Sequence, residues 1–407
     1  MKNTLENPNM ILFDKLPKDW KDVRLKYLVG LIREKTSESF SSEQLIGLEN
    51  IESWYGRRIK TESESIEIDE NSSINSFSKN DVLFGKLRPY LAKALIVDFN
   101  GICSNELLVM RPRAVVTNKY LLYSLLNKSF IELVNSSAYG TKMPRAEWDF
   151  IGTIKIPLPP LSTQKAIANF LDKETARIDS LISAKERFIG LLEEKRKATI
   201  TEAVTRGLSP DVKMKDSGVE WLGRVPRHWE VVKLKYVGYL KSGESITSES
   251  IRDVGEYPVY GGNGLRGFTD SFTHEGEFVL IGRQGALCGN INYAKGKFFA
   301  SEHAVVVSIL NKNQTDWLGA LLNAMNLNQY SQSAAQPGLS VDTIKGLDIP
   351  VPPISEQKQI VDFIRKQTTR IDKLIQKTNE SLELLKERRT ALIGEAVTSK
   401  LKIGEKV

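Results

Sequence analysis

The sequence is poor in the residues that build most metal, redox and proton-transfer sites. Its 407 residues include two cysteines, Cys103 and Cys288, and three histidines. The cysteines are far apart and lie in apolar or glycine-rich stretches, so we expect neither a disulfide framework nor a cysteine-based zinc site. The histidines are scattered, and none has a cysteine or carboxylate at metal-ligand spacing. We therefore expect no bound metal.

Signals for phosphate binding and for membranes are also lacking. No G-x-x-x-x-G-K-[ST] motif is present, and no stretch approaches the ~20 apolar residues of a membrane span. Residues 262–267 match G-x-G-x-x-G, but an extended run follows them where a helix is required, so we predict a tight turn that presents Asn263. Residues 1–20 lack the apolar core of a signal peptide. We expect a soluble, cytoplasmic protein with no cofactor and no catalytic centre of its own.

The composition is that of an ordinary globular protein with a mild basic excess. Apolar residues make up 41%, the net charge is +7 and the pI is near 9.1. Such a balance fits a solvated basic surface as well as a polyanion partner, so charge alone does not separate the two. The length favours two or three folding units.

An internal repeat is the strongest feature of the sequence. Residues 158–208 align without a gap on residues 351–401, and 25 of the 51 aligned positions are identical. Weaker copies lie upstream: residues 16–28 match 225–237, and the segments 84–90 and 104–110 correspond loosely to 281–287 and 301–307. The chain therefore holds two tandem copies of one plan, in which a module precedes a long repeated segment.

The repeated segments are predicted to be long helices. Each follows a Pro-Pro pair, at 159–160 and 352–353, and Ser162 and Ser355 are the predicted N-caps. Apolar residues then recur at spacings of three and four, the ~3.5-residue period of a coiled coil. We expect the two helices, each roughly 60 Å long at ~1.5 Å per residue, to pair antiparallel around a pseudo-twofold axis.

Both modules have the pattern of α+β domains with β-rich cores. Short apolar runs at 82–84, 94–97 and 107–110 in the first module, and at 257–260, 278–281 and 304–309 in the second, are separated by glycine and proline. One short helix is predicted in each, near 119–135 and 316–330. The predicted domains are the first module at 1–157, the first long helix at 158–210, a linker with the second module at 211–350, and the second long helix at 351–407.

Loops in both modules carry side chains suited to DNA. Arginine and lysine can bond the O6/N7 edge of guanine, and asparagine or glutamine can bond the N6/N7 edge of adenine. Loops on a rigid frame are a common format for recognition. The predicted DNA-binding residues are Tyr55, Arg57, Arg58, Lys86, Arg88, Tyr90, Lys142 and Arg145 in the first module, and Asn263, Arg266, Arg283 and Gln284 in the second.

Several of these segments resemble a known family. The helix starts PLPPLSTQKAIANFLD and VPPISEQKQIVDFI, and the linker AVTRGLSPDVKMKDSGVEWLGRVPRHWEV, are similar to the specificity subunits of type I restriction-modification systems. So are FGKLRPYLAKALIVDFNGICSNELLV and YPVYGGNGLRGFTD, which look like parts of target-recognition domains. The resemblance covers nearly the whole chain.

The resemblance implies a division of labour. Each module would be a target-recognition domain that reads one half of a bipartite site in double-stranded DNA, and the antiparallel coiled coil would set the spacer between the halves. Two methyltransferase subunits would dock on the chain and bring S-adenosylmethionine, and two restriction subunits would add ATP-driven translocation and cleavage. The specificity subunit itself would catalyse nothing.

Two alternatives stay open from the residues. One is the specificity subunit of a related combined restriction-methylation system that lacks the ATP motor. The other, from a different class, is a coiled-coil scaffold without DNA binding, against which the recurrence of basic and amide-rich loops in both modules argues.

Overall fold

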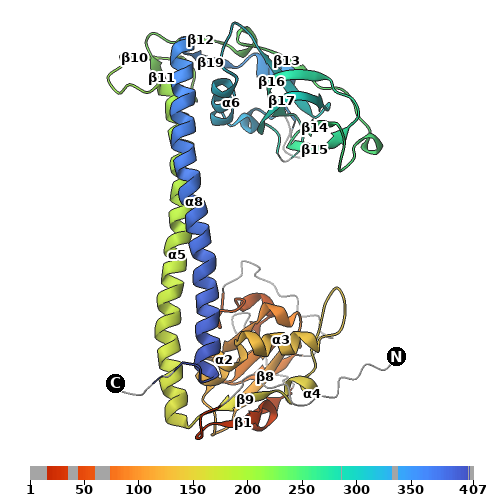
Figure 1. Cartoon of the computed structure of the whole chain (residues 1–407), viewed down its shortest axis with the longest axis vertical. Coiled ribbons are helices and arrows are strands. Elements are labelled where there is room, and N and C mark those ends of the chain that lie inside the picture. The colour runs from red at the N-terminus through yellow and green to blue at the C-terminus, as the bar shows by residue number, and fades with distance from the viewer. Residues whose placement is uncertain are drawn as a thin grey trace. The chain divides into compact units, whose positions relative to one another are not determined.

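The computed structural model describes residues 16–34, 45–59, 74–285, 287–331, 338–401 and 403. Its contacts form two compact units. The first unit comprises Met1–Lys185 with Glu380–Val407, and the second comprises Glu186–Asn379. Each unit contains one module and a part of both long helices, α5 (Leu161–Arg206) and α8 (Ile354–Val397) (Figure 1). The α+β class and the two long helices are confirmed, whereas the domain boundaries given above stay a prediction.

The long helices begin earlier than the sequence indicated. Helix α5 starts directly after Pro160, whose carbonyl already accepts from the backbone N–H of Gln164 (2.9 Å). The carbonyl of Pro353 accepts from Gln357 in the same way (2.9 Å). Ser162 and Ser355 therefore lie inside the first turn, and their assignment as N-caps is wrong, because the proline occupies the flanking position.

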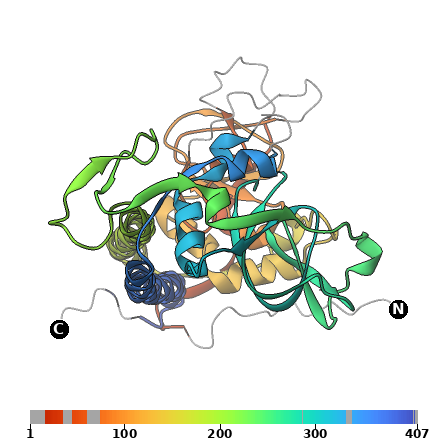
Figure 2. The same ribbon diagram turned by 90° about the horizontal axis from the view of Figure 1, so that it is seen from above.

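Within each unit α5 and α8 run side by side in opposite directions (Figures 1 and 2). In the first unit Asp179 Oδ1 accepts from Arg389 Nε (2.8 Å), and in the second Asp372 Oδ1 accepts from Arg196 Nε (3.1 Å). The 193-residue repeat relates Asp179 to Asp372 and Arg196 to Arg389, so one ion pair forms twice. The predicted antiparallel pairing is confirmed.

The first module contains two small sheets flanked by helices. The four-stranded sheet has the order β2-β8-β5-β6 (Val29–Ile32, Leu107–Pro112, Val82–Gly85, Ala94–Ile96). The three-stranded sheet has the order β3-β7-β4 (Leu45–Ile46, Gly101–Cys103, Asn75–Phe77). The helices are α1 (Leu25–Leu28), α2 (Asn118–Leu125), α3 (Lys128–Ser136) and α4 (Trp148–Ile151). Strands β1 (Lys21–Arg24) and β9 (Lys155–Leu158) pair just before α5.

The second module merges the corresponding strands into one sheet. Its order is β13-β18-β16-β17-β14-β15 (Gly238–Ser242, Ala304–Ile309, His274–Gly282, Ile291–Ala300, Tyr257–Gly261, Gly264–Thr269). The helices are α6 (Thr315–Ala324) and α7 (Val341–Lys345). The linker carries a ribbon of β10 (Met214–Asp216) and β11 (Arg224–Pro226), and β12 (Glu230–Lys233) pairs with β19 (Asp348–Val351) just before α8.

The two modules share one strand plan despite their few identical residues. Val82 of β5 pairs with Met110 of β8, and Val279 of β16 pairs with Val307 of β18, so both strands keep an offset of 197 residues. The neighbouring strands β6 and β17 obey the same offset. The short helices also recur, although the first module divides its predicted helix into α2 and α3. The loose correspondence seen in the sequence is therefore a true structural repeat.

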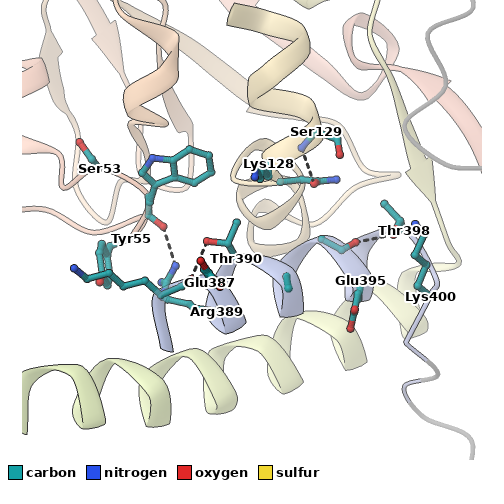
Figure 3. Close-up of a pocket in the computed structure, with 15 residues that line it drawn as sticks. Ser53, Tyr55, Lys128, Ser129, Glu387, Arg389, Thr390, Glu395, Thr398 and Lys400 are labelled. Atoms are coloured by element: carbon teal, nitrogen blue, oxygen red, sulfur yellow. Dashed lines mark hydrogen bonds between the residues drawn. The ribbon is translucent and has the colours of Figure 1, made fainter. Parts of the chain in front are cut away.

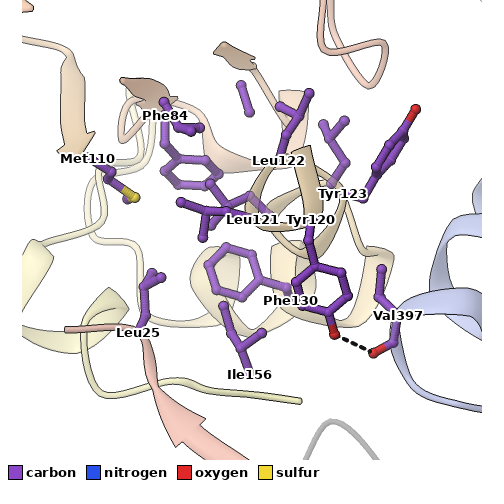
Figure 4. Close-up of a cluster of buried hydrophobic side chains, with 14 of the residues drawn as sticks. Leu25, Phe84, Met110, Tyr120, Leu121, Leu122, Tyr123, Phe130, Ile156 and Val397 are labelled. Carbon is purple, nitrogen blue, oxygen red and sulfur yellow. Dashed lines mark hydrogen bonds between the residues drawn. The ribbon is translucent and has the colours of Figure 1, made fainter. Parts of the chain in front are cut away.

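Each core includes the end of a long helix. In the first unit the rings of Phe84 and Phe130 meet edge to face at 5.8 Å, and Tyr120 donates to the carbonyl oxygens of Pro157 (2.7 Å) and Val397 (3.4 Å) (Figure 4). The second core is built around the fully buried indoles of Trp229 and Trp317. Both cores are thus closed by α5 and α8, so the helices are part of each module's fold.

A buried glutamine at one repeat position anchors each module to its long helix. Gln164 accepts from the backbone N–H of Thr117 (2.9 Å) and donates to the carbonyls of Val115 and Pro159 (both 2.9 Å). Gln357, its equivalent, accepts from the N–H of Gln314 (2.9 Å) and donates to Pro352 O. Both side chains are completely buried.

Replacing Gln164 or Gln357 with alanine is expected to lower the free energy of unfolding by about 1–3 kcal/mol, because buried backbone groups lose their partners. Chemical denaturation of each variant measures this loss. The exposed helix residue Lys165 provides a control, since its replacement should change stability by less than about 0.5 kcal/mol. Equal losses in all three variants would contradict the anchoring role.

Candidate nucleic-acid interface

Three loops meet in the first unit to form a common frame, residues 85–93, 104–106 and 139–146. The backbone N–H of Lys86 donates to Glu106 O (2.9 Å), and Lys86 O accepts from the N–H of Ala146 (2.9 Å). The N–H of Arg88 donates to Pro144 O (2.7 Å). The sequence predicted candidate residues in the first and third of these loops, and the structure brings them together.

The second unit repeats two of these three backbone hydrogen bonds. The backbone N–H of Arg283 donates to His303 O (2.9 Å), and Arg283 O accepts from the N–H of Leu339 (2.9 Å). Arg283, His303 and Leu339 are the equivalents of Lys86, Glu106 and Ala146 at the offsets of 197 and 193 residues. Gly282 is required here, because a Cβ at this position would lie 2.1 Å from the carbonyl oxygen of Gly262.

The side chains on the first frame are mainly basic. Arg145 forms an ion pair with Glu106, and the side chains are 41% and 27% exposed. Arg88 has a left-handed backbone (φ 49°), a conformation that non-glycine residues adopt mostly at strained or functional positions. Tyr90 and Lys142 are exposed, while Lys86 is half-buried.

The side chains on the second frame combine amides with arginines. Gln284 Oε1 and His303 Nδ1 lie 2.9 Å apart and form a hydrogen bond. Asn263, exposed on the turn between β14 and β15, accepts from Asn290 Nδ2 (2.8 Å). Arg283 Nη1 lies 3.4 Å from Ser242 Oγ, and Arg266 is exposed on β15. The predicted glycine turn that presents Asn263 is confirmed, since β14 and β15 form a hairpin around it.

Tyr55, Arg57 and Arg58 lie on a different loop. The guanidinium groups of Arg57 and Arg389 lie 4.8 Å and 4.4 Å from the centre of the Tyr55 ring. Arg57 also forms an ion pair with Glu52. Burial, and then the charge of Asp179, raise the pKa of Tyr55 above its ordinary value. Arg58 lies over the ring of Phe99 (5.2 Å).

Tyr55 also lines a pocket of about 770 Å³ between this loop, the start of α3 and the last turns of α8 (Figure 3). The same pocket wall contains Arg389, whose Nη1 donates to the carbonyl oxygen of Trp54 (2.9 Å). Among the predicted residues, Tyr55 and Arg57 therefore have packing partners that account for their positions within the first unit.

Lys93 lies at the end of the loop 85–93 that carries Lys86 and Arg88. Its ammonium donates to the carbonyl oxygen of Leu48 (2.6 Å), and burial lowers its pKa. This hydrogen bond links the loop 85–93 to the segment that contains Leu48.

Sequence reasoning missed the residues that hold the candidate side chains. Glu106 and His303 occupy equivalent positions in the segments SNE and SEH, but neither was singled out as part of a site. The repeat at an offset of 197 residues was the available signal, because it shows that Glu106 and His303 occupy equivalent positions.

The described residues contain no cluster of histidine, cysteine, aspartate or glutamate with the geometry of a metal site. None of the helices in the described part of the chain has the length and hydrophobicity to cross a bilayer. Cys103 and Cys288 are free and buried, and burial raises the pKa of the Cys103 thiol to about 12.

Comparison with protein families gives a match over most of the chain. The model described as type I restriction modification DNA specificity domain matches twice, at residues 17–186 and 226–384. These two matches coincide with the two copies of the structural repeat.

Curated relatives point the same way. A Type I restriction enzyme EcoprrI specificity subunit of Escherichia coli is 46% identical over 134 residues, about a third of either chain (32% and 33%). A Type I restriction enzyme MjaVIII specificity subunit of Methanocaldococcus jannaschii is 25% identical over 96% of this chain and 94% of its own.

Solved structures share the fold. A chain from a structural study of complex assembly and conformational transition of the type I R-M system superposes with a TM-score of 0.78 at 18% identity, covering 95% of this chain and 100% of that one. The HsdS subunit from Thermoanaerobacter tengcongensis gives a TM-score of 0.57 at 19% identity, with 95% and 99% covered.

Proposed function

Since the chain belongs to the family of type I restriction-modification specificity subunits, which recognise DNA targets, we propose that each of its two units reads one half of a bipartite DNA site through its loop frame. The observation that carries this proposal is the repetition of one backbone frame with different side chains. Lys86, Arg88 and Arg145 project from the first frame, and Arg283 and Gln284 project from the second. One frame with two side-chain sets fits two half-sites of different sequence.

The chemistry of the two sets differs in a way that suits base reading. Arginine forks match the acceptor pair of guanine, whereas an amide supplies both the donor and the acceptor that adenine requires. Lys142 is exposed and has no described partner within the frame, and it suits a phosphate contact that orients the duplex without reading it.

The proposal extends to protein partners on the long helices. In the first unit Leu181 of α5 and Leu384 of α8 are 45% and 66% exposed, and in the second unit their repeat equivalents Leu374 and Leu191 are 39% and 62% exposed. Exposed leucines on a paired helix are candidates for a protein contact. Because the pair recurs in each unit, it supports docking of two copies of one partner, the methyltransferase subunit.

The helices also support a role in setting the spacer. Each is one uninterrupted element of 46 or 44 residues that belongs partly to the first unit and partly to the second. A continuous helix transmits its length rigidly, so the number of unread base pairs between half-sites should be fixed. Restriction subunits with an ATP motor would complete the assembly, and the chain itself supplies no catalytic group to it.

Binding of the chain, in complex with its methyltransferase subunits, to a random duplex library at several salt concentrations tests the proposal. We expect enrichment of two defined half-sites. The logarithm of the binding constant should fall linearly with the logarithm of the salt concentration, because phosphate contacts release bound counterions. Absence of sequence preference at every salt concentration would instead favour a scaffold that does not read DNA.

A further inference from the structure

We propose that Glu106 and His303 are equivalent positioning residues for base reading: each holds, from the same point of the frame, the side chain that meets a base. Glu106 holds Arg145 in the first unit, and His303 holds Gln284 in the second. The inference rests on the proposed reading of one half-site by each unit, and it identifies which side chains set the specificity.

The equivalence of the two residues follows from the backbone. The carbonyl of Glu106 accepts from the N–H of Lys86, and the carbonyl of His303 accepts from the N–H of Arg283, both at 2.9 Å. Strands β8 and β18, which follow them, occupy the same place in their sheets at the same offset of 197 residues. The main chain thus fixes both positions in one way, and the side chains are free to differ.

The partners of these two residues are equivalent in role but come from different loops. Leu87 forms an isolated β-bridge with Arg145, and Gln284 forms one with Gly338. Leu87 corresponds to Gln284, and Arg145 corresponds to Gly338. The first unit therefore carries its long polar side chain on one side of the bridge, and the second carries it on the other. In the first unit Glu106 bonds Arg145, the polar member of its bridge. In the second unit His303 bonds Gln284, the polar member of the equivalent bridge.

Unsatisfied buried atoms mark the same turn in both units. Among the described residues, Ser104 Oγ, Glu106 Oε2 and Arg145 Nε have no hydrogen-bond partner in the first unit. Ser301 Oγ and Glu302 Oε2 have none in the second. Ser301 corresponds to Ser104, and it is completely buried. Native proteins leave few such atoms unpaired, so an ordered water or a ligand group can bond them at this turn.

A side chain that is held in place before DNA binds should discriminate more strongly between bases. A free arginine or glutamine on a loop can rotate to accept several bases, whereas one that is held presents its donors in a single geometry. Arg145 keeps further N–H donors beyond the one that bonds Glu106, enough for a bidentate contact with guanine. Gln284 retains one end of its amide for adenine and a second lone pair on its oxygen. We expect the first unit to read a guanine through Arg145 and the second unit to read an adenine through Gln284.

Selection of bound duplexes from a random library by the complex with methyltransferase subunits tests this. Glu106→Ala should relax one position of one half-site by about 10-fold in discrimination, and His303→Ala should do so only in the other half-site. The conservative Glu106→Gln should recover most of the discrimination, because its amide oxygen can still accept from Arg145. Glu147→Ala is the matched control, since this carboxylate bonds Tyr139 of the same loop (2.8 Å) but no candidate base reader.

The outcomes separate the inference from the proposed function. If the wild-type complex selects two half-sites and the Glu106 and His303 variants select the same ones unchanged, the positioning role is wrong and the function stands. Equal weakening on all sequences, or relaxation of both half-sites by one variant, would overturn it as well. If the wild-type complex selects no half-site, the proposed function itself fails. Thermal unfolding of each variant shows whether a loss of selectivity comes from a folded protein.

Discussion

Replacing Arg389 with alanine is expected to lower the free energy of unfolding of the first unit by about 3–5 kcal/mol, the cost of leaving one partner of a buried ion pair alone. The Arg389 side chain is only 6% exposed and its partner Asp179 is 18% exposed. The guanidinium also donates to Trp54 O and lies 4.4 Å from the ring of Tyr55. Chemical denaturation, followed by a probe in the first module, measures the loss.

The internal repeat supplies a matched control for this experiment. Arg196 forms the equivalent pair with Asp372 in the second unit, but those side chains are 43% and 55% exposed. Water screens such a pair, so Arg196→Ala should cost at most about 1 kcal/mol. Equal losses at the two arginines would contradict the view that the loop carrying Tyr55 makes the first pair the stronger one.

Lengthening both long helices together is expected to change the spacer of the DNA site and leave both half-sites intact. Seven residues inserted after Lys185 in α5 and after Asn379 in α8 preserve the ion pair within each unit and the phase of the apolar seam. Seven residues add about 10 Å of helix at 1.5 Å each. The spacer should therefore grow by at most about three base pairs at 3.4 Å each. Methylation mapping with the variant measures the new spacing.

An insertion in α5 alone serves as the control. It cannot keep both Asp179–Arg389 and Arg196–Asp372 in register, so we expect loss of stability and of methylation. Altered half-sites with an unchanged spacer in the double insertion would show that the helices do not set the spacing. The same double insertion with four residues in each helix, about one turn, should give a smaller change of spacer.

The long helices were predictable because their signal is local and occurs twice. Apolar periodicity, the preceding proline pairs and the identity of the two copies all indicate paired helices before any contact is known. Their starts were placed two residues late. Serine is a good N-cap in general, but Pro160 and Pro353 occupy the position that directly precedes each helix.

The candidate site was predictable only in part, because its geometry depends on distant contacts. Residue type and position in a loop identified Arg145 and Gln284 as candidates. Nothing in the local sequence shows that Glu106 lies beside Arg145, or that His303 lies beside Gln284. Tyr55 and Arg57 had the residue types of a DNA-contacting loop. The contact of Tyr55 with Arg389, from the far end of the chain, gives it a packing role that periodicity could not anticipate.

Genome-wide mapping of methylated adenines, in a host that carries this chain with its methyltransferase subunit, tests the central claim most directly. Two units with one frame and different side chains predict a motif of two unlike half-sites, with a spacer of fixed length and one methylated adenine in each half. A single continuous motif, two identical half-sites or a spacer of variable length would contradict the account.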